Sequence, residues 1–221
     1  MLHLPDPGPI AIVGAGGFGR ECLDIVEALN ECGGELDFVG FLDDGDVDDA
    51  LLERRKAALL GAVDDTSRYS ARAVIAIGNG RARAAVGERL SASSVTSPVL
   101  VHPQATLGSE CSVGAGTILN AGARVTTNVT LGRHVQIHAN ATVGHDATLE
   151  DWVSVFPGAT ISGSVVLERG VTIGTGANVL PGCRIGANSF VGAGAVVVGD
   201  VPAGATVVGV PARALAQGSN P

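Results

Sequence analysis

His145 and the following residue, Asp146, place two side chains suited to proton transfer at neighbouring positions. A neutral imidazole, whose ordinary pKa is about 6.5, accepts a proton near neutral pH. A carboxylate beside the ring fixes its tautomer and stabilises the imidazolium that forms. Residues of these two types are suited to general-base catalysis, in which an imidazole removes a proton from an attacking nucleophile.

The sequence does not indicate a nucleophile supplied by the protein itself. The four cysteines are isolated, without CxxC pairing or metal-ligand spacing, as expected of reduced thiols: Cys22, Cys32, Cys111 and Cys183. No serine or cysteine has an evident activating neighbour in the sequence. The residues therefore do not indicate a covalent intermediate on the protein.

A second chemical feature is the segment GAGGFG at residues 14–19, which has GxGxxG spacing. It follows a predicted strand at residues 10–14 and opens a predicted helix at residues 19–30. Glycines allow a tight turn and let a phosphate approach the backbone N–H groups at the start of the helix. The residues expected to contact a nucleotide here are Gly14, Gly16, Gly17 and Phe18.

Two further predicted strands end in polar residues suited to the same ligand. One ends in Asp43 and Asp44, whose carboxylates can bind ribose or base hydroxyls. Another ends in Gly78 and Asn79, and an open parallel sheet presents its binding crevice at such carboxyl ends. The region is half of a full dinucleotide fold, which favours a mononucleotide-sized ligand over NAD. The alternative for the two aspartates is a solvated acidic loop, because three more aspartates follow.

A six-residue repeat at residues 101–197 must position His145. Every sixth residue from Val101 to Val197 is Val, Ile or Leu, in 17 consecutive matches without an insertion. The residue four positions later is Ala, Val, Cys, Ser or Thr, and Gly clusters one and three positions after the aliphatic residue. This period suits short strands joined by tight corners, whereas an α-helix requires spacings of three and four. His145 falls at a corner, so its side chain is expected to project outward.

The composition excludes several classes of protein. The chain has 221 residues with 32 Gly, 3% aromatic and 16% charged residues, and a mean hydropathy of +0.35. These values argue against disorder, and the glycines lack the three-residue period of collagen. The net charge of −8 argues against nucleic acid as a partner. The sequence shows neither a signal peptide nor an apolar run long enough for a membrane span, so a cytoplasmic location is expected.

The two regions together resemble the hexapeptide-repeat acyltransferases over nearly the whole chain. The segments IHANATVGHD at residues 137–146 and VVGVPAR at residues 207–213 are similar to segments of these enzymes. The resemblance implies a Rossmann-like α/β domain followed by an all-β left-handed parallel β-helix with three hexapeptides per turn. Within the family, the chain is similar to bacterial N-acetyltransferases of nucleotide-linked 4-amino-4,6-dideoxy sugars and to the sialic acid O-acetyltransferase-like proteins.

The resemblance implies a division of labour along the chain. We expect a nucleotide-sugar-binding domain at residues 1–92, a linker at residues 93–100, and an acyltransferase domain with a C-terminal tail at residues 101–221. The family's β-helix binds acetyl-CoA between the subunits of a homotrimer, and no metal is expected. The implied activity is acetyl transfer from acetyl-CoA to the amino group of a nucleotide-linked sugar.

The resemblance also assigns roles to residues of the β-helix. It places the general base on His145 and its acidic partner on Asp146, with His138 as a further candidate for placing His145 or the acyl group. One coil of 18 residues stacks His145 between Thr127 and Gly163, and Gly163 leaves an open groove beside the ring. The implied acetyl-CoA contacts are Ser154, Gly163, Thr175, Ala193 and Arg213. Some members carry a histidine in place of Ser154, which puts that contact in doubt.

Other functions compete with N-acetylation of an amino sugar. The same scaffold can O-acetylate a sugar hydroxyl, which needs the base at least as much because an alcohol is less acidic. Gamma-type carbonic anhydrases share the β-helix and bind zinc through histidines. Here His102 and His138 lie two coils apart, but no third ligand is evident. A non-catalytic sugar-nucleotide-binding protein would leave the outward His145 unexplained.

Overall fold

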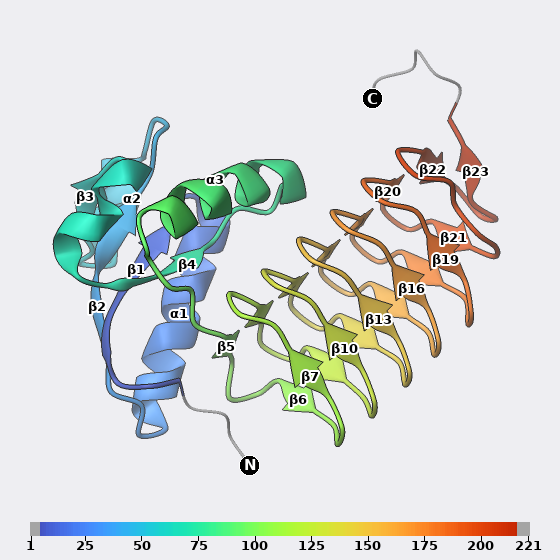
Figure 1. Ribbon diagram of the computed structural model, residues 1–221, viewed down its shortest axis with the longest axis horizontal. Coiled ribbons are helices and arrows are strands. Elements are labelled where there is room, and N and C mark those ends of the chain that lie inside the picture. The colour runs from blue at the N-terminus through green and yellow to red at the C-terminus, as the bar shows by residue number, and fades with distance from the viewer. Residues whose placement is uncertain (1–4, 216–221) are drawn as a thin grey trace. The chain divides into compact units, whose positions relative to one another are not determined.

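The structure is a computed structural model that describes residues 5–215, which form two compact units dividing between Pro103 and Gln104 (Figure 1). The C-terminal tail expected from the sequence includes residues 216–221, which lie outside the described residues. Within residues 5–215, no helix combines the length and the apolar character needed to cross a membrane.

The first unit is built on a parallel sheet with the strand order β3-β2-β1-β4, as in doubly wound α/β folds. Its strands are β1 (Gly8–Val13), β2 (Leu36–Leu42), β3 (Leu59–Gly61), β4 (Arg72–Ile75) and, outside this sheet, β5 (Leu100–Val101). Its helices are α1 (Gly17–Glu31), α2 (Asp49–Arg54), the 3-10 helix Val63–Tyr69 and α3 (Gly80–Ala92). The predicted Rossmann-like α/β fold is confirmed.

Apolar periodicity accounts for the core of this unit. Residues 10–13 of the central strand β1 are 0% exposed, as expected of a parallel strand that is covered on both faces. Helix α1 buries Cys22, Ile25, Val26 and Leu29, which recur at the spacing of one helical face, and it packs against β1 and β2.

The segment at residues 93–100 is held by the first unit. The N–H group of Ala73 in β4 donates to the carbonyl oxygen of Thr96 at 2.9 Å. Val95 packs against the apolar cluster formed by β1, β4 and α3. The predicted linker therefore contributes to the core of the first unit.

Two glycines let α1 begin close to the end of β1. Gly14 has φ +105°, and a Cβ atom there would lie 2.7 Å from the carbonyl oxygen of Ala76. A Cβ atom at Gly19 would collide with the carbonyl oxygen of Gly14. A Cβ atom at Gly17 would meet nothing closer than the Arg20 guanidinium at 4.0 Å.

Gly19→Ala is therefore expected to destabilise the first unit by about 2–3 kcal/mol, because the added methyl group overlaps backbone that has no room to move. Gly17→Ala, two residues earlier, is the matched control and is expected to be neutral or to stabilise by about 0.5–1 kcal/mol. Urea unfolding measures both variants. An equal loss of stability in the two would contradict the close approach of α1 to the turn.

The second unit is a left-handed parallel β-helix whose two-residue strands stack into three sheets (Figure 1). The first sheet contains β6 (Thr106–Leu107), β9 (Arg124–Val125), β12 (Thr142–Val143), β15 (Thr160–Ile161), β18 (Asn178–Val179) and β21 (Val196–Val197). The second contains β7 (Ser112–Val113), β10 (Thr130–Leu131), β13 (Thr148–Leu149), β16 (Val166–Leu167) and β19 (Arg184–Ile185). The third contains β8 (Ile118–Leu119), β11 (Gln136–Ile137), β14 (Ser154–Val155), β17 (Thr172–Ile173), β20 (Phe190–Val191), β22 (Thr206–Val208) and the antiparallel β23 (Arg213–Ala214).

The register of these sheets confirms the predicted coil. Thr130 pairs with Thr148, and Thr142 pairs with Thr160, so one coil spans three hexapeptides. The aliphatic and small positions of the repeat both face the interior, and Val143 and Ala147 are 0% and 1% exposed. The period changes only at the end, where Phe190 pairs with Thr206.

The two glycine-rich positions of the repeat have different physical causes. Three residues after the aliphatic position the backbone is left-handed, with φ near +60° at Asn128, Asn140 and Asp146, a conformation that Gly, Asn and Asp tolerate best. One residue after it, the next coil passes close by. A Cβ atom at Gly144 would lie 2.6 Å from the backbone nitrogen of Gly163. The position three residues after the aliphatic residue therefore requires a residue that tolerates the left-handed conformation. The position one residue after the aliphatic residue requires a residue without a side chain.

Candidate active site

His145 lies at the corner between β12 and β13, with 63% of its side chain exposed. Its Nδ1 atom is 2.6 Å from Oδ2 of Asp146, so the short aspartate side chain reaches the ring. The predicted outward orientation is confirmed.

Backbone hydrogen bonds hold this corner between the coils before and after it. The N–H group of Asp146 donates to the carbonyl oxygen of Thr127 at 3.2 Å, and the carbonyl oxygen of His145 accepts from Ser164 at 2.7 Å. The stacking of His145 between Thr127 and Gly163 is therefore as the 18-residue coil predicts.

The imidazole ring lies directly over Gly163. A Cβ atom at Gly163 would be 2.6 Å from both Cε1 and Nε2 of His145. The missing side chain is thus the space that the ring occupies, and the Nε2 edge of the ring faces this position. The ring fills part of the groove that the sequence predicts beside it.

The electrostatics of the corner favour one tautomer of His145. The hydrogen bond from Asn128, together with that to His145, holds the pKa of Asp146 below its ordinary value. A carboxylate that stays ionised accepts the hydrogen on Nδ1, which leaves the lone pair of the imidazole on Nε2. The arrangement can therefore take a proton at Nε2.

The other predicted residues of the β-helix lie at other places in the coil. His138 follows β11, and its buried ring packs edge-on against Phe156 with the centroids 5.0 Å apart. Ser154 is fully buried in β14. The chain does not bring His138 to the corner that carries His145, because the two residues follow strands of different sheets.

The predicted acetyl-CoA contacts divide between two corners in the same way. Gly163 follows β15 at the corner that carries His145. Thr175 and Ala193 follow β17 and β20 at the corner that carries His138, where both are exposed. Arg213 lies in β23 beside a cavity of about 220 Å³ that Val198, Asp200 and Pro202 also line.

In the first unit, the glycines of the turn separate into two kinds. Gly14 and Gly19 are required by close packing of the backbone, as described above. Gly16 and Gly17 are exposed, and a Cβ atom at Gly16 would meet nothing within 4 Å. Phe18 is half-buried beside them. Close packing within the protein therefore does not require glycine at Gly16 or Gly17, and contact of these residues with a ligand stays a prediction.

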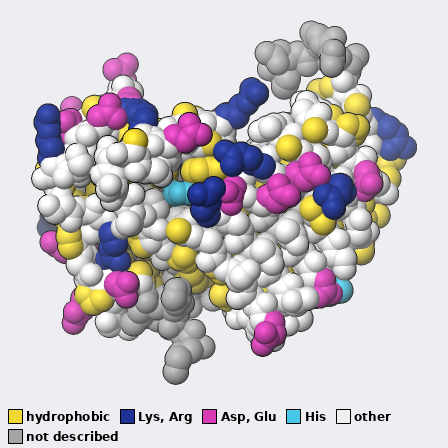
Figure 2. All heavy atoms as spheres, in the orientation of Figure 1, with side chains coloured by type: hydrophobic (Ala, Val, Ile, Leu, Met, Phe, Trp, Pro, Cys, Tyr) yellow, Lys and Arg dark blue, Asp and Glu magenta, His cyan; other side chains and the backbone are white. Residues whose placement is uncertain are grey.

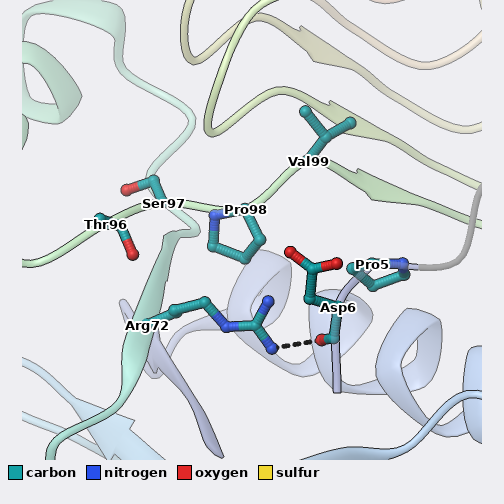
Figure 3. A pocket seen from close by; sticks show the side chains of 7 residues that line it. All are labelled: Pro5, Asp6, Arg72, Thr96, Ser97, Pro98 and Val99. Carbon is teal, nitrogen blue, oxygen red and sulfur yellow. Dashed lines mark hydrogen bonds between the residues drawn. The ribbon is translucent and has the colours of Figure 1, made fainter. Parts of the chain in front are cut away.

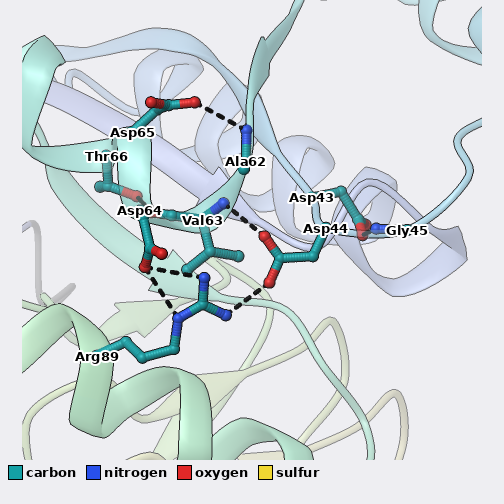
Figure 4. A network of polar contacts seen from close by, with 9 residues as sticks. All are labelled: Asp43, Asp44, Gly45, Ala62, Val63, Asp64, Asp65, Thr66 and Arg89. Atoms are coloured by element: carbon teal, nitrogen blue, oxygen red, sulfur yellow. Dashed lines mark hydrogen bonds and ion pairs between the residues drawn. The ribbon is translucent and has the colours of Figure 1, made fainter.

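The two aspartates after β2 bind groups of the protein. Oδ2 of Asp43 accepts from the N–H group of Ala15 at 2.7 Å, so this carboxylate holds the glycine-rich turn. Asp44 accepts from the N–H group of Val63 at 2.9 Å and pairs with Arg89 at 2.6 Å (Figure 4). The hydrogen bond from Arg89 is the main cause that lowers the pKa of Asp44.

Arg89 of α3 is a residue that the sequence did not single out. It also pairs with Asp64 at 2.8 Å, so one guanidinium joins the end of β2 to the 3-10 helix (Figure 4). Binding of ribose hydroxyls by Asp43 and Asp44 stays a prediction. In the structure, the carboxylates of both residues hold neighbouring loops in place.

The loop after β4 is held from beneath by a buried cation. Arg83 is 0% exposed and donates to the carbonyl oxygens of Ile77 at 2.6 Å and Gly78 at 3.1 Å. Burial lowers the pKa of its guanidinium to about 9, which leaves it charged at neutral pH. Asn79 caps α3 by accepting from Ala82 at 3.0 Å. Gly78 and Asn79 therefore lie on a fixed loop at the carboxyl end of β4.

A separate cavity of about 260 Å³ opens at the other end of the sheet (Figure 3). Arg72, the first residue of β4, lines it and donates to the carbonyl oxygen of Asp6 at 2.5 Å. Ligands of open α/β sheets bind at the carboxyl ends of the strands, so this cavity does not lie at the edge where the sequence predicts a nucleotide.

Among residues 5–215, no three His, Cys, Asp or Glu side chains come together in a group that could hold a metal ion. The zinc hypothesis placed on His102 and His138 therefore has no third ligand in the part of the chain that the structure describes.

Comparisons with known proteins relate both units to acyltransferases. The family model of the PglD N-terminal domain matches residues 9–90, and that of the bacterial transferase hexapeptide, with six repeats, matches residues 164–199. The comparison with curated protein sequences gave no match.

Three solved structures are similar over almost the full chain. The acetyltransferase domain of PglB from Neisseria gonorrhoeae is 33% identical, with a TM-score of 0.83 over 94% of this chain and 99% of that one. PerB from Caulobacter crescentus, solved with CoA and GDP-perosamine, is 27% identical, with a TM-score of 0.82 over 97% and 100%. WeeI from Acinetobacter baumannii is 29% identical, with a TM-score of 0.77 over 93% and 99%.

The chain belongs to the hexapeptide-repeat acyltransferases, in the subfamily that contains nucleotide-sugar N-acetyltransferases and sialic acid O-acetyltransferase-like proteins. It is an acyltransferase, and its similarity to the PglB domain and PerB makes it a sugar acetyltransferase.

Proposed function

We propose that the protein transfers an acetyl group from acetyl-CoA to the amino group of a nucleotide-linked sugar of the 4-amino-4,6-dideoxy type. The observation that carries this proposal is the His145–Asp146 pair, which presents Nε2 at an exposed corner over Gly163. PerB was solved with CoA and GDP-perosamine, and the PglB domain was solved with acetyl-CoA. PerB was also solved as variants in which one histidine is replaced by Asn or Ala.

The proposed reaction is a direct transfer with His145 as the catalytic base. The sugar amine attacks the thioester carbonyl carbon, and Nε2 of His145 takes a proton from the amine as the new C–N bond forms. The C–S bond then breaks, and the imidazolium returns that proton to the departing thiolate. Asp146 keeps Nδ1 protonated and stabilises the imidazolium in between.

The turn at Gly16 and Gly17 is proposed to hold the phosphates of the sugar nucleotide. Gly17→Ala folds normally on the argument given above, and its methyl group enters the space left open at the start of α1. We expect it to weaken binding of the nucleotide about tenfold or more. Calorimetric titration with UDP, GDP and dTDP measures this, and an affinity equal to that of the wild type would contradict the assignment.

The site is proposed to need a second copy of the chain. Gly163 lies at one corner of the β-helix, and Thr175 and Ala193 lie at another, so one chain alone does not line a single groove with all three. A homotrimer with acetyl-CoA between neighbouring subunits brings both corners to each site. Light scattering should then give three times the chain mass of 22.0 kDa.

The deciding experiment follows acetyl-CoA consumption across a panel of nucleotide-linked amino sugars that differ in base and sugar. Turnover of a 4-amino sugar, with the acetyl group located on nitrogen by NMR, supports the proposal. Turnover of a hydroxyl acceptor and of no amine would replace it with sugar O-acetylation on the same base. Binding without turnover of any acceptor would favour a binding protein.

A further inference from the structure

The carboxylate of Asp146 is held on both sides. Oδ2 is 2.6 Å from Nδ1 of His145, and Oδ1 accepts from Nδ2 of Asn128 at 2.7 Å. Asn128 lies 18 residues earlier, at the same corner one coil before. The three side chains form a continuous chain of hydrogen bonds that ends at the imidazole.

We propose that Asn128 is a positioning residue of the active site, whose side-chain amide orients Asp146 so that the carboxylate keeps His145 in the tautomer with Nδ1 protonated. This inference rests on the proposed function, because it concerns the base that the reaction uses. Asn128 acts through Asp146 and does not itself need to touch the substrate.

The backbone places the two corner residues in equivalent conformations. Asn128 has φ +56° and Asp146 has φ +60°, the left-handed conformation found at this position of the repeat. The N–H group of Asn128 donates to Ser109 at 2.9 Å, and that of Asp146 donates to Thr127 at 3.2 Å. Each corner is therefore anchored to the coil before it, and the asparagine amide lies within reach of the carboxylate one coil later.

An exposed pair of neighbouring residues needs such a support. The side chains of His145 and Asp146 are 63% and 49% exposed, and exposed ion pairs of this kind are weak and poorly ordered. A second hydrogen bond to the carboxylate restricts its rotation, and a neutral amide does so without adding a charge beside the imidazole. The hydrogen bond from Asn128 is also the first cause that lowers the pKa of Asp146, which keeps the carboxylate ionised.

Asparagine at a left-handed corner also has a purely structural explanation, because it tolerates this conformation. The test must therefore remove the amide without straining the backbone. Asn128→Gly keeps the conformation and removes the donor. Asn128→Asp keeps the shape and places a second carboxylate against Asp146. Asn188, with φ +57° at the corner that follows β19, supplies the matched controls Asn188→Gly and Asn188→Asp.

Steady-state kinetics with acetyl-CoA and the best amino-sugar acceptor are compared for the four variants. We expect kcat to fall about tenfold in Asn128→Gly, the effect of one lost hydrogen bond to a charged group. Repulsion should make the fall in Asn128→Asp larger, on the order of a hundredfold. Both KM values should stay within about twofold of the wild type, because neither variant changes a group that binds substrate. The Asn188 variants should retain the kcat of the wild type, with thermal midpoints like those of the Asn128 pair.

Wild-type kcat in both Asn128 variants, alongside an inactive His145→Gln, would overturn the inference and leave the proposed function standing. A wild-type enzyme that turns over no amino sugar would overturn the proposed function. A second readout then still tests the inference, since ¹⁵N NMR of histidine-labelled protein reports the tautomer of His145 directly. A single tautomer protonated at Nδ1 in the wild type and a mixture in Asn128→Gly supports the inference, and identical spectra contradict it.

Discussion

Replacing His145 by Gln is expected to lower kcat by about a thousandfold, the middle of the range for removal of a general base. Glutamine retains a polar side chain near the same size but cannot take up a proton at the reacting amine. Because the imidazole is largely exposed at a corner, the free energy of unfolding should change little. Stopped assays of acetyl-CoA consumption measure the rate, and thermal unfolding monitors the fold.

The pH dependence of kcat/KM separates loss of the base from general damage. In the wild type, activity should fall at acid pH, because a general base accepts a proton only in its unprotonated form. The residual activity of His145→Gln should lack that acid limb. A variant that keeps the acid limb, or that retains more than a tenth of the wild-type rate, would assign the base to another residue.

Gly163→Ala is expected to reduce kcat by about a hundredfold, because the methyl group must displace the ring of His145, and an error of about 1 Å in the position of a catalytic group has effects of this size. A Cβ atom at Gly163 would lie 2.6 Å from Cε1 and Nε2 of His145. The backbone of Gly163 is outside the left-handed region, so alanine adds a steric conflict with the ring and no backbone strain.

Gly199→Ala is the matched control for stability. Gly199 occupies the same position of the repeat two coils later, and a Cβ atom there would meet nothing within 4 Å. Both variants should unfold within a few degrees of the wild type, and ¹⁵N NMR should show a changed environment of His145 only in Gly163→Ala. Full activity in Gly163→Ala would mean that the ring does not lie over Gly163 during the reaction.

Local patterns were enough to predict the scaffold and the outward corner that carries His145. In each hexapeptide, one aliphatic and one small residue must both face the interior of the coil. Because this pattern repeats in every hexapeptide, the spacing alone placed Val143 and Ala147 inside. The same period placed His145 on the outside. Asp146 follows it directly, so their contact depends on little more than the conformation of one corner.

Contacts between distant residues decided the rest. From the sequence, Asp43 and Asp44 were predicted to be available to a ligand at the end of a strand. Their partners Ala15 and Arg89 are distant in the sequence, so no local pattern predicts these contacts. Asn128 was not singled out, although an asparagine one coil before an acid is a signal that the known period makes readable. His138 was a candidate through the family resemblance, and the coil places it at another corner because it follows β11, whereas His145 follows β12 of a different sheet.

The sequence by itself determined the two folds, the period of the β-helix and the outward pair of His145 and Asp146. These depend on the order of apolar and polar residues over short distances, where strand and helix geometry leaves few alternatives. Only the tertiary structure decided that the ring of His145 occupies the space over Gly163, that Asn128 supports Asp146 and that Arg89 engages Asp44. Such contacts join residues 18 to 45 positions apart, and their hydrogen bonds form only when the coils and strands are stacked.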